Sequence, residues 1–166
     1  MKSILLPLLI LITGFSTQAQ NKPCSSPEAS QFDFWVGTWN LYGADSSLTG
    51  TNTVYKILDG CTVQENFESS KIAYSGKSWS MYNAQTKLWQ QTWVDNQGGY
   101  IVLEGKFENG AMNLITGIVK VNGKEQINRM RYHDIKKDGF EWDWETSLDN
   151  GVTWKTSWHL RYERKK

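Results

Sequence analysis

A length of 166 residues suggests one domain, and a formal net charge of +1 argues against an electrostatic grip on nucleic acid. After the N-terminal segment, no apolar run is long enough to span a bilayer. We therefore expect neither a nucleic-acid partner nor a membrane span.

Residues 1–19 have the pattern of a secretory signal peptide. Lys2 supplies a positive n-region, and Ile4 to Ile12 form an apolar h-region. Thr17-Gln18-Ala19 offers small residues at the cleavage positions before Gln20. A buried N-terminal helix is the alternative. The signal peptide predicts a periplasmic or secreted protein.

Residues 20–30 are polar and predict an exposed N-terminal arm, followed by one domain over 31–166. Within the arm, Ser26 suits a helix N-cap and Pro27 the first helical position, which predicts a helical turn towards Trp35.

The sequence has two cysteines, Cys24 and Cys61, and both lie in the exported part. An oxidising compartment allows them to pair. We expect a disulfide that ties the arm to the strand beginning near Cys61; two free thiols are the alternative.

From Trp39 onward, short runs rich in Val, Ile, Thr, Tyr and Trp alternate with turn residues, which is typical of an all-β sandwich or barrel. Asn/Asp-Gly pairs suited to type I′ turns end at Gly60, Gly110, Gly123, Gly139 and Gly151, so neighbouring strands should pair as antiparallel hairpins. Closing such a meander removes its edges, so we favour a single up-and-down barrel of about ten strands. The expected strands are Thr38–Tyr42, Thr51–Leu58, Thr62–Glu68, Gly76–Asn83, Leu88–Asp95, Gly99–Phe107, Ala111–Val121, Glu125–Asp134, Phe140–Ser147 and Thr153–Glu163.

The stretch Phe32 to Trp39 predicts a short helical plug at one end of this barrel. Gly37 lets the backbone turn into the first strand, and Trp35 and Trp39 would cover the floor. Arg161, near the chain end, is a candidate to stack on Trp39, although its parity opposite Leu160 is awkward for that contact.

This stretch carries a family resemblance. Phe34-Trp35-Val36-Gly37-Thr38-Trp39 resembles the Gly-x-Trp opening of calycins, the lipocalin and fatty-acid-binding superfamily, and Arg161-Tyr162-Glu163-Arg164 is similar to the Arg-containing last strand of that group. A closer resemblance is to a bacterial domain-of-unknown-function family of secreted, lipocalin-like barrels related to nitrobindins. It extends over Leu58 to Asn66, Trp89 to Gly99 and Ser147 to Trp154. The resemblance implies a calycin-like barrel and no settled activity.

Several residues are candidates to line a ligand cavity. Glu65 lies between Val63 and Phe67 on one strand face, so an inward orientation would bury it and require a partner such as Arg129 or Arg131. A structural ion pair, a ligand-orienting acid and a proton-transferring acid all remain open for Glu65. The full candidate set is Glu65, Trp79, Met81, Gln91, Trp93 and Arg129.

Two turn motifs are predicted to have structural roles. Asp95 or Asn96 could cap the turn before Gly99, and the same loop could form the barrel mouth. Ser147 to Trp154 matches the Asp box of sialidases, in which Asp149, Gly151 and Trp154 build a hairpin turn; a single copy predicts no propeller.

We expect a non-enzymatic barrel that binds a small, largely apolar molecule, without catalytic residues, metal or cofactor; its oligomeric state is open. One alternative is a carbohydrate-binding module that uses exposed tryptophans, with Trp79 and Trp89 as candidates. Another is a haem protein or barrel enzyme. The resemblance to nitrobindins implies haem ligation by a last-strand histidine, near the position of His159, although strand alternation places His159 outward.

Overall fold

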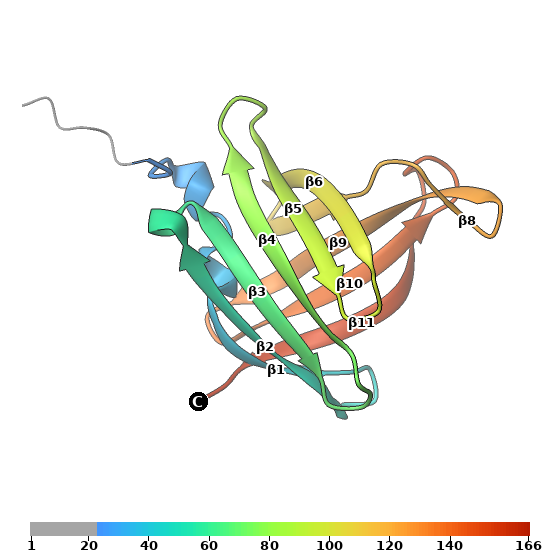
Figure 1. The fold of residues 1–166 in the computed structure, drawn as a ribbon, viewed down its shortest axis with the longest axis horizontal. Helices are drawn as coiled ribbons and strands as arrows, with labels where there is room; N and C mark the ends of the chain where they lie inside the picture. Colours follow the sequence, from blue (N-terminus) through green and yellow to red (C-terminus); the bar gives the residue numbers. More distant parts are fainter. Residues whose placement is uncertain (1–22) are drawn as a thin grey trace, which may run out of the picture.

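A computed structural model describes residues 23–166, and the expected signal peptide lies outside this range (Figure 1). Within it, no helix is long and apolar enough to cross a membrane. The short 3-10 turns are η1 (Pro27–Ser30), η2 (Asp33–Trp35) and η3 (Leu58–Gly60). The strands are β1 (Gly37–Tyr42), β2 (Leu48–Ile57), β3 (Thr62–Ser69), β4 (Ser75–Asn83), β5 (Leu88–Asp95), β6 (Tyr100–Glu108), β7 (Ala111–Ile115), β8 (Val119–Val121), β9 (Lys124–Lys136), β10 (Gly139–Ser147) and β11 (Lys155–Arg164).

The strands form a closed antiparallel barrel. Neighbours pair in the order β10-β11-β1-β2-β3-β4-β5-β6-β7-β9, and the pairing of β9 with β10 closes the ring. The predicted all-β barrel of about ten strands is therefore confirmed. The extra strand β8 pairs only with the beginning of β9, in a hairpin that projects from the barrel (Figure 1). The predicted strand Ala111–Val121 is wrong in its length, because the chain leaves the ladder after Ile115 and divides into β7 and β8.

Most predicted hairpin turns have the expected backbone. Asn109 and Gly110 have φ of 52° and 76°, and Asn122 and Gly123 have φ of 51° and 78°, as type I′ turns require. The prediction for the pair at Gly139 is wrong, because Gly139 already belongs to β10 and neither it nor the preceding residue has a positive φ.

One end of the barrel is filled by the aromatic plug, to which η1 and η2 lead (Figure 1). Phe32, Trp35 and Trp39 are fully buried. The Phe32 ring meets Trp89 and Tyr132 edge-on, with centroids 4.8 and 5.3 Å away. The indole Nε1 of Trp39 donates to the Trp35 carbonyl at 2.8 Å. Trp89, a candidate for an exposed tryptophan of a carbohydrate-binding module, is buried against Phe32 at this closed end instead.

An arginine covers the floor, but it is Arg164 and not Arg161. The Arg164 guanidinium lies 4.1 Å from the Trp39 ring centroid and donates to the Val36 carbonyl at 2.9 Å. Arg164 shares the parity of the buried Leu160, whereas Arg161 has the opposite parity and lies over Tyr42 on the outer face. Gly37 is required at this crossing, because its φ is +143° and a Cβ atom there would collide with the guanidinium.

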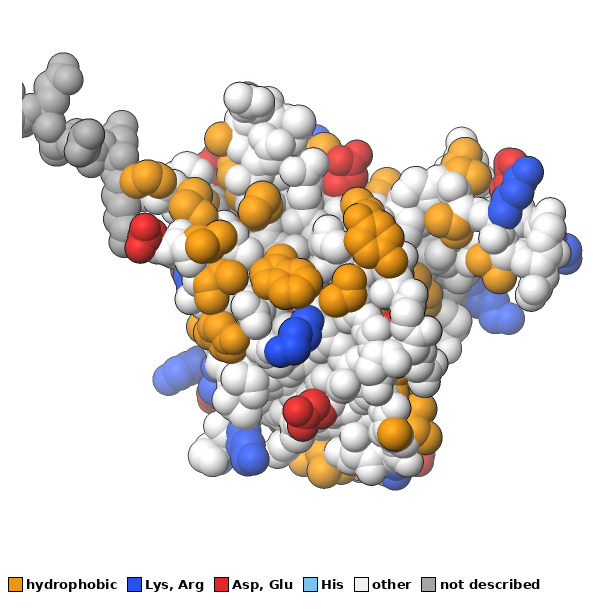
Figure 2. Space-filling model, in the orientation of Figure 1, with side chains coloured by type: hydrophobic (Ala, Val, Ile, Leu, Met, Phe, Trp, Pro, Cys, Tyr) orange, Lys and Arg blue, Asp and Glu red, His pale blue; other side chains and the backbone are white. Residues whose placement is uncertain are grey.

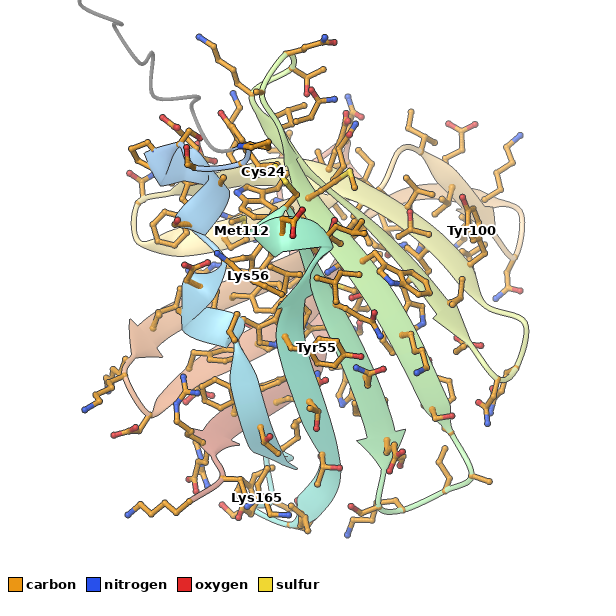
Figure 3. All side chains as sticks on the ribbon, turned by 60° about the vertical axis from the view of Figure 1, so that its left-hand side comes forward. Cys24, Tyr55, Lys56, Tyr100, Met112 and Lys165 are labelled. Atoms are coloured by element: carbon orange, nitrogen blue, oxygen red, sulfur yellow. A yellow bond between two sulfur atoms is a disulfide. The ribbon has the colours of Figure 1, made fainter. Side chains whose placement is uncertain are left out.

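The predicted disulfide joins Cys24 to Cys61, 37 residues apart in sequence. Figure 3 labels Cys24 at the plug end. Ser26 caps η1 as predicted, accepting from the Ala29 amide at 3.4 Å, and Ala29 is buried. Most of the described arm is exposed, as expected, while the disulfide and the buried Ala29 of η1 tie it to the barrel.

Candidate functional site

The open half of the barrel contains a cavity of about 250 Å³. Its wall is mostly aromatic and includes Trp93, Trp142, Trp144 and Trp158. Among the described residues, no Lys, Arg or His contributes to this wall, and Glu65 is its only carboxylate. The cavity is therefore apolar with one acidic group.

Glycines on the inner face make room for the aromatic rings. A Cβ atom on Gly76 would fall within the indole of Trp93, and one on Gly50 would press against the Phe67 ring at 3.1 Å. Both rings lie against bare backbone, so the wall stays thin and the centre of the lumen stays open.

Asp95 fixes two of the wall residues at the mouth. One carboxylate oxygen accepts hydrogen bonds from the Tyr74 hydroxyl at 3.1 Å and the Trp93 indole at 3.2 Å. The other accepts from the amides of Gly99 and Gln97, at 2.8 and 2.9 Å. The Gly99 amide is the main cause that lowers the pKa of Asp95. Asp95 is thus both the predicted turn cap and an anchor for the mouth aromatics.

Glu65 is 6% exposed and accepts hydrogen bonds from two neutral side chains. The Ser78 hydroxyl donates to Oε2 and the Asn52 amide donates to Oε1, both at 2.6 Å. The predicted partner Arg129 is wrong. It pairs with Glu145 at 2.6 Å and stacks over Trp154 at 4.1 Å, because its parity turns it to the outer face.

Burial raises the pKa of Glu65 to about 7, although the hydrogen bonds from Ser78 and Asn52 oppose the shift. Burial also raises the pKa of Tyr132 and Tyr162, and the charge of Glu65 adds to both shifts. These two hydroxyls therefore stay neutral through the pH range in which Glu65 changes charge.

The Asn52 amide can serve both protonation states of Glu65. Its Nδ2 also lies 3.3 Å from the Tyr162 hydroxyl, while its Oδ1 has no protein partner. Turned over, the amide would place Oδ1 where a protonated Glu65 and the Tyr162 hydroxyl can donate to it. The network therefore supports a carboxyl that changes charge near neutral pH.

Of the remaining residues predicted to line the cavity, only Trp93 does so. Trp93 lies in the cavity wall, whereas Trp79 and Met81 lie on the outer face, where Met81 is 44% exposed. Their neighbours Ser78 and Ser80 point inward instead, because small side chains leave room for Glu65 and Gln91. Gln91 is buried but donates to Ser80 at 2.8 Å and does not reach the cavity wall.

Sequence reasoning missed Trp142, Trp158 and Tyr162 as cavity residues. They come from β10 and β11, whose alternation was recognised as an apolar face. The alternation of apolar residues in these two strands could have indicated them, but alternation alone does not distinguish a packed wall from a wall beside a cavity.

Both histidines lie on the outer face. His133 and His159 each approach a carboxylate oxygen of Asp143 at 2.8 Å. Within residues 23–166, no group of His, Cys, Asp and Glu is placed to hold a metal ion. His159 therefore does not face the lumen, and the proposed haem ligation does not fit this barrel.

The Ser147–Trp154 turn has the hydrogen bonds of an Asp box. Asp149 accepts from the Thr153 hydroxyl at 2.5 Å and from its amide at 2.8 Å, and these bonds lower the pKa of Asp149 to about 2. The Trp154 indole donates to the Gly151 carbonyl at 3.0 Å. These contacts give Asp149, Gly151 and Trp154 a structural part in the β10–β11 turn.

No protein-family model matches the sequence, and no curated protein matches it significantly.

Proposed function

We propose that this chain is an exported, non-enzymatic, calycin-like barrel that binds a small, largely apolar molecule in its lumen. The observation that carries the proposal is the aromatic cavity of about 250 Å³, which one end of the barrel closes with a packed plug. An engineered apolar cavity of about 150 Å³ binds benzene, so this one suits a ligand of about ten non-hydrogen atoms.

The calycin-like assignment is supported by the way the ends of the chain meet. Gly37-x-Trp39 opens β1, and Arg164 at the end of β11 covers Trp39. Export is supported by the Cys24–Cys61 disulfide, because such bonds persist in oxidising compartments.

The alternatives receive less support. A haem is much larger than about ten atoms, and no histidine among the described residues lines the lumen. The outer face has a band of exposed apolar side chains over β3 to β6 (Figure 2). Tyr55 on β2 and Tyr100 on β6, labelled in Figure 3, are 42% and 70% exposed. Among residues 23–166, this band sets Trp79 beside Met81 and Val102 and contains no row of tryptophans, so it does not favour a carbohydrate module.

The test compares two tryptophan substitutions at adjacent positions of β6. Ile101 lines the cavity, whereas Val102 faces outward and is 52% exposed. Isothermal titration with naphthalene should show binding to the wild type and to Val102→Trp. Ile101→Trp should abolish binding, because the larger ring fills the lumen.

Equal binding by both variants would place the ligand outside the lumen and contradict the proposal. Native mass spectrometry of the exported protein is the companion measurement. It should show a bound small molecule in the wild type and none in Ile101→Trp.

A further inference from the structure

We infer that the lumen selects organic cations: its ligand carries a positively charged amine or quaternary ammonium group on a small apolar body. This inference rests on the lumen being a binding site, as proposed above, and adds the charge of the ligand. It follows from what surrounds Glu65.

The wall of the cavity has the composition of a cation-binding aromatic cage. Phe67 lies between Trp93 and Trp158, with ring centroids 6.2 and 6.4 Å away, and the Trp158 ring meets Trp142 at 5.2 Å. These four rings come from four different strands, so they surround the opening instead of stacking along one wall. A cation within about 6 Å of such rings is attracted by their electron-rich faces.

Glu65 supplies the countercharge. It lies one inward position deeper on β3 than Phe67, at the level where β3 pairs with Ser78 of β4. Its carboxylate accepts hydrogen bonds from neutral donors only, so its charge is not balanced by a protein cation. An ionised Glu65 in an aromatic cavity is therefore an incomplete ion pair, which a bound cation completes.

The mouth has the same sign of charge. Asp95 holds Tyr74 and Trp93 at the rim, and its lowered pKa keeps it ionised at neutral pH. An entering anion would meet Asp95 first and Glu65 next, and neither carboxylate has a basic neighbour in the cavity wall. The lumen should therefore reject fatty acids and other carboxylates of suitable size.

Binding should depend on pH through Glu65. The other titratable groups in the cavity wall are Tyr74, Tyr132 and Tyr162, all with raised pKa, so they remain neutral between pH 5.5 and 8.5. Glu65 has a pKa of about 7 and changes charge within that interval. A cation should bind tightly at pH 8.5 and weakly at pH 5.5.

The experiment uses two probes of the same shape. Phenyltrimethylammonium carries a permanent charge, and tert-butylbenzene is its neutral counterpart; each has about ten non-hydrogen atoms, as the cavity requires. Affinities are measured by tryptophan fluorescence and isothermal titration on the full exported chain at pH 5.5 and 8.5. Because neither probe titrates, any pH dependence comes from the protein.

At pH 8.5 the cation should bind at least tenfold more tightly than its neutral counterpart, and this preference should disappear at pH 5.5. Glu65→Gln should abolish the preference at both pH values while retaining the neutral probe. Glu145→Gln is the matched control, because Glu145 is also 6% exposed but pairs with Arg129 outside the cavity. Both histidines remain in Glu65→Gln, so any pH dependence that they contribute survives in that variant.

If the neutral probe binds as tightly as the cation to the wild type at pH 8.5, the inference is overturned and lumen binding stands. If neither probe binds, lumen binding itself fails. Circular dichroism checks the fold of both variants, and the pH series on the wild type decides the question even if Glu65→Gln does not fold.

Discussion

The two ends of the barrel are built from the same aromatic residue types, yet one end is solid and the other contains a cavity. At the closed end, Phe32, Trp35 and Trp39 are fully buried and contact one another or the rings around them. At the open end, Trp158 is 42% exposed, and the rings surround a cavity beside Glu65.

One end is solid and the other hollow because side chains of the plug fill the space between the rings at the closed end only. The plug brings its own side chains into the lumen from η2 and the residues around it, and Arg164 seals the floor from outside. Nothing in the described chain enters the other end, where inward glycines draw Trp93 and Phe67 back against the wall. Aromatic content alone therefore does not indicate whether a barrel is packed or hollow.

Substitution of the floor tryptophan should give the largest effect. Trp39→Ala removes a fully buried ring, its hydrogen bond to Trp35 and the stacking surface for Arg164. We expect the free energy of unfolding to fall by about 4 kcal/mol. Urea denaturation measures it, and a loss below about 1 kcal/mol would mean that the floor is not packed as described.

The next largest effect should be a change in the free energy of unfolding with pH, caused by the buried Glu65. The pKa of Glu65 is about 7 in the folded protein, against an ordinary value of 4.5. Between these two pH values, Glu65 is therefore mostly protonated in the folded protein and mostly ionised in the unfolded chain. The free energy of unfolding should therefore be highest below about pH 4.5 for this group and fall by about 3 kcal/mol as the pH rises through 7.

The measurement is a series of urea denaturations from pH 5 to 8 on the wild type and Glu65→Gln. The variant should lack this decline, so that it gains stability relative to the wild type as the pH rises. Parallel curves for the two proteins would show that Glu65 titrates normally.

The smallest effect on stability is expected at the mouth. Trp158→Ala removes a half-exposed ring, so the free energy of unfolding should change by about 1 kcal/mol or less. The same variant should weaken ligand binding about tenfold, because Trp158 is part of the cavity wall. A stability loss as large as that of Trp39→Ala would remove the distinction between a structural end and a binding end.

Much of the fold could be predicted from local patterns. Leu88–Asp95 has the predicted bounds, and the alternation from Phe140 to Trp144 correctly placed these rings on one face. Strand periodicity and turn residues are local properties, so one sequence contains them.

The site could be predicted only in part, because it depends on register between distant strands. Ser78 lies opposite Glu65 in the β3–β4 register, whereas Asn52 lies opposite Phe67 in the β2–β3 register and reaches Glu65 diagonally. No local signal gives either register. In Ser78-Trp79-Ser80, hydrophobicity favours an inward tryptophan, whereas the need to accommodate Glu65 turns the serines inward. Similarly, Arg164 reaches Trp39 and Arg161 does not, because Arg164 has the inward parity and is the last residue of β11.

The contact between Arg164 and the plug also constrains when the barrel can form. The hydrogen bond from Arg164 to the Val36 carbonyl joins residues 128 positions apart, and Trp39–Tyr42 of β1 pair with Arg161–Arg164 of β11. The floor is therefore incomplete until the last strand has been synthesised, and such non-local pairing is slow to form. A nascent chain that lacks β11 therefore cannot close the ring of strands.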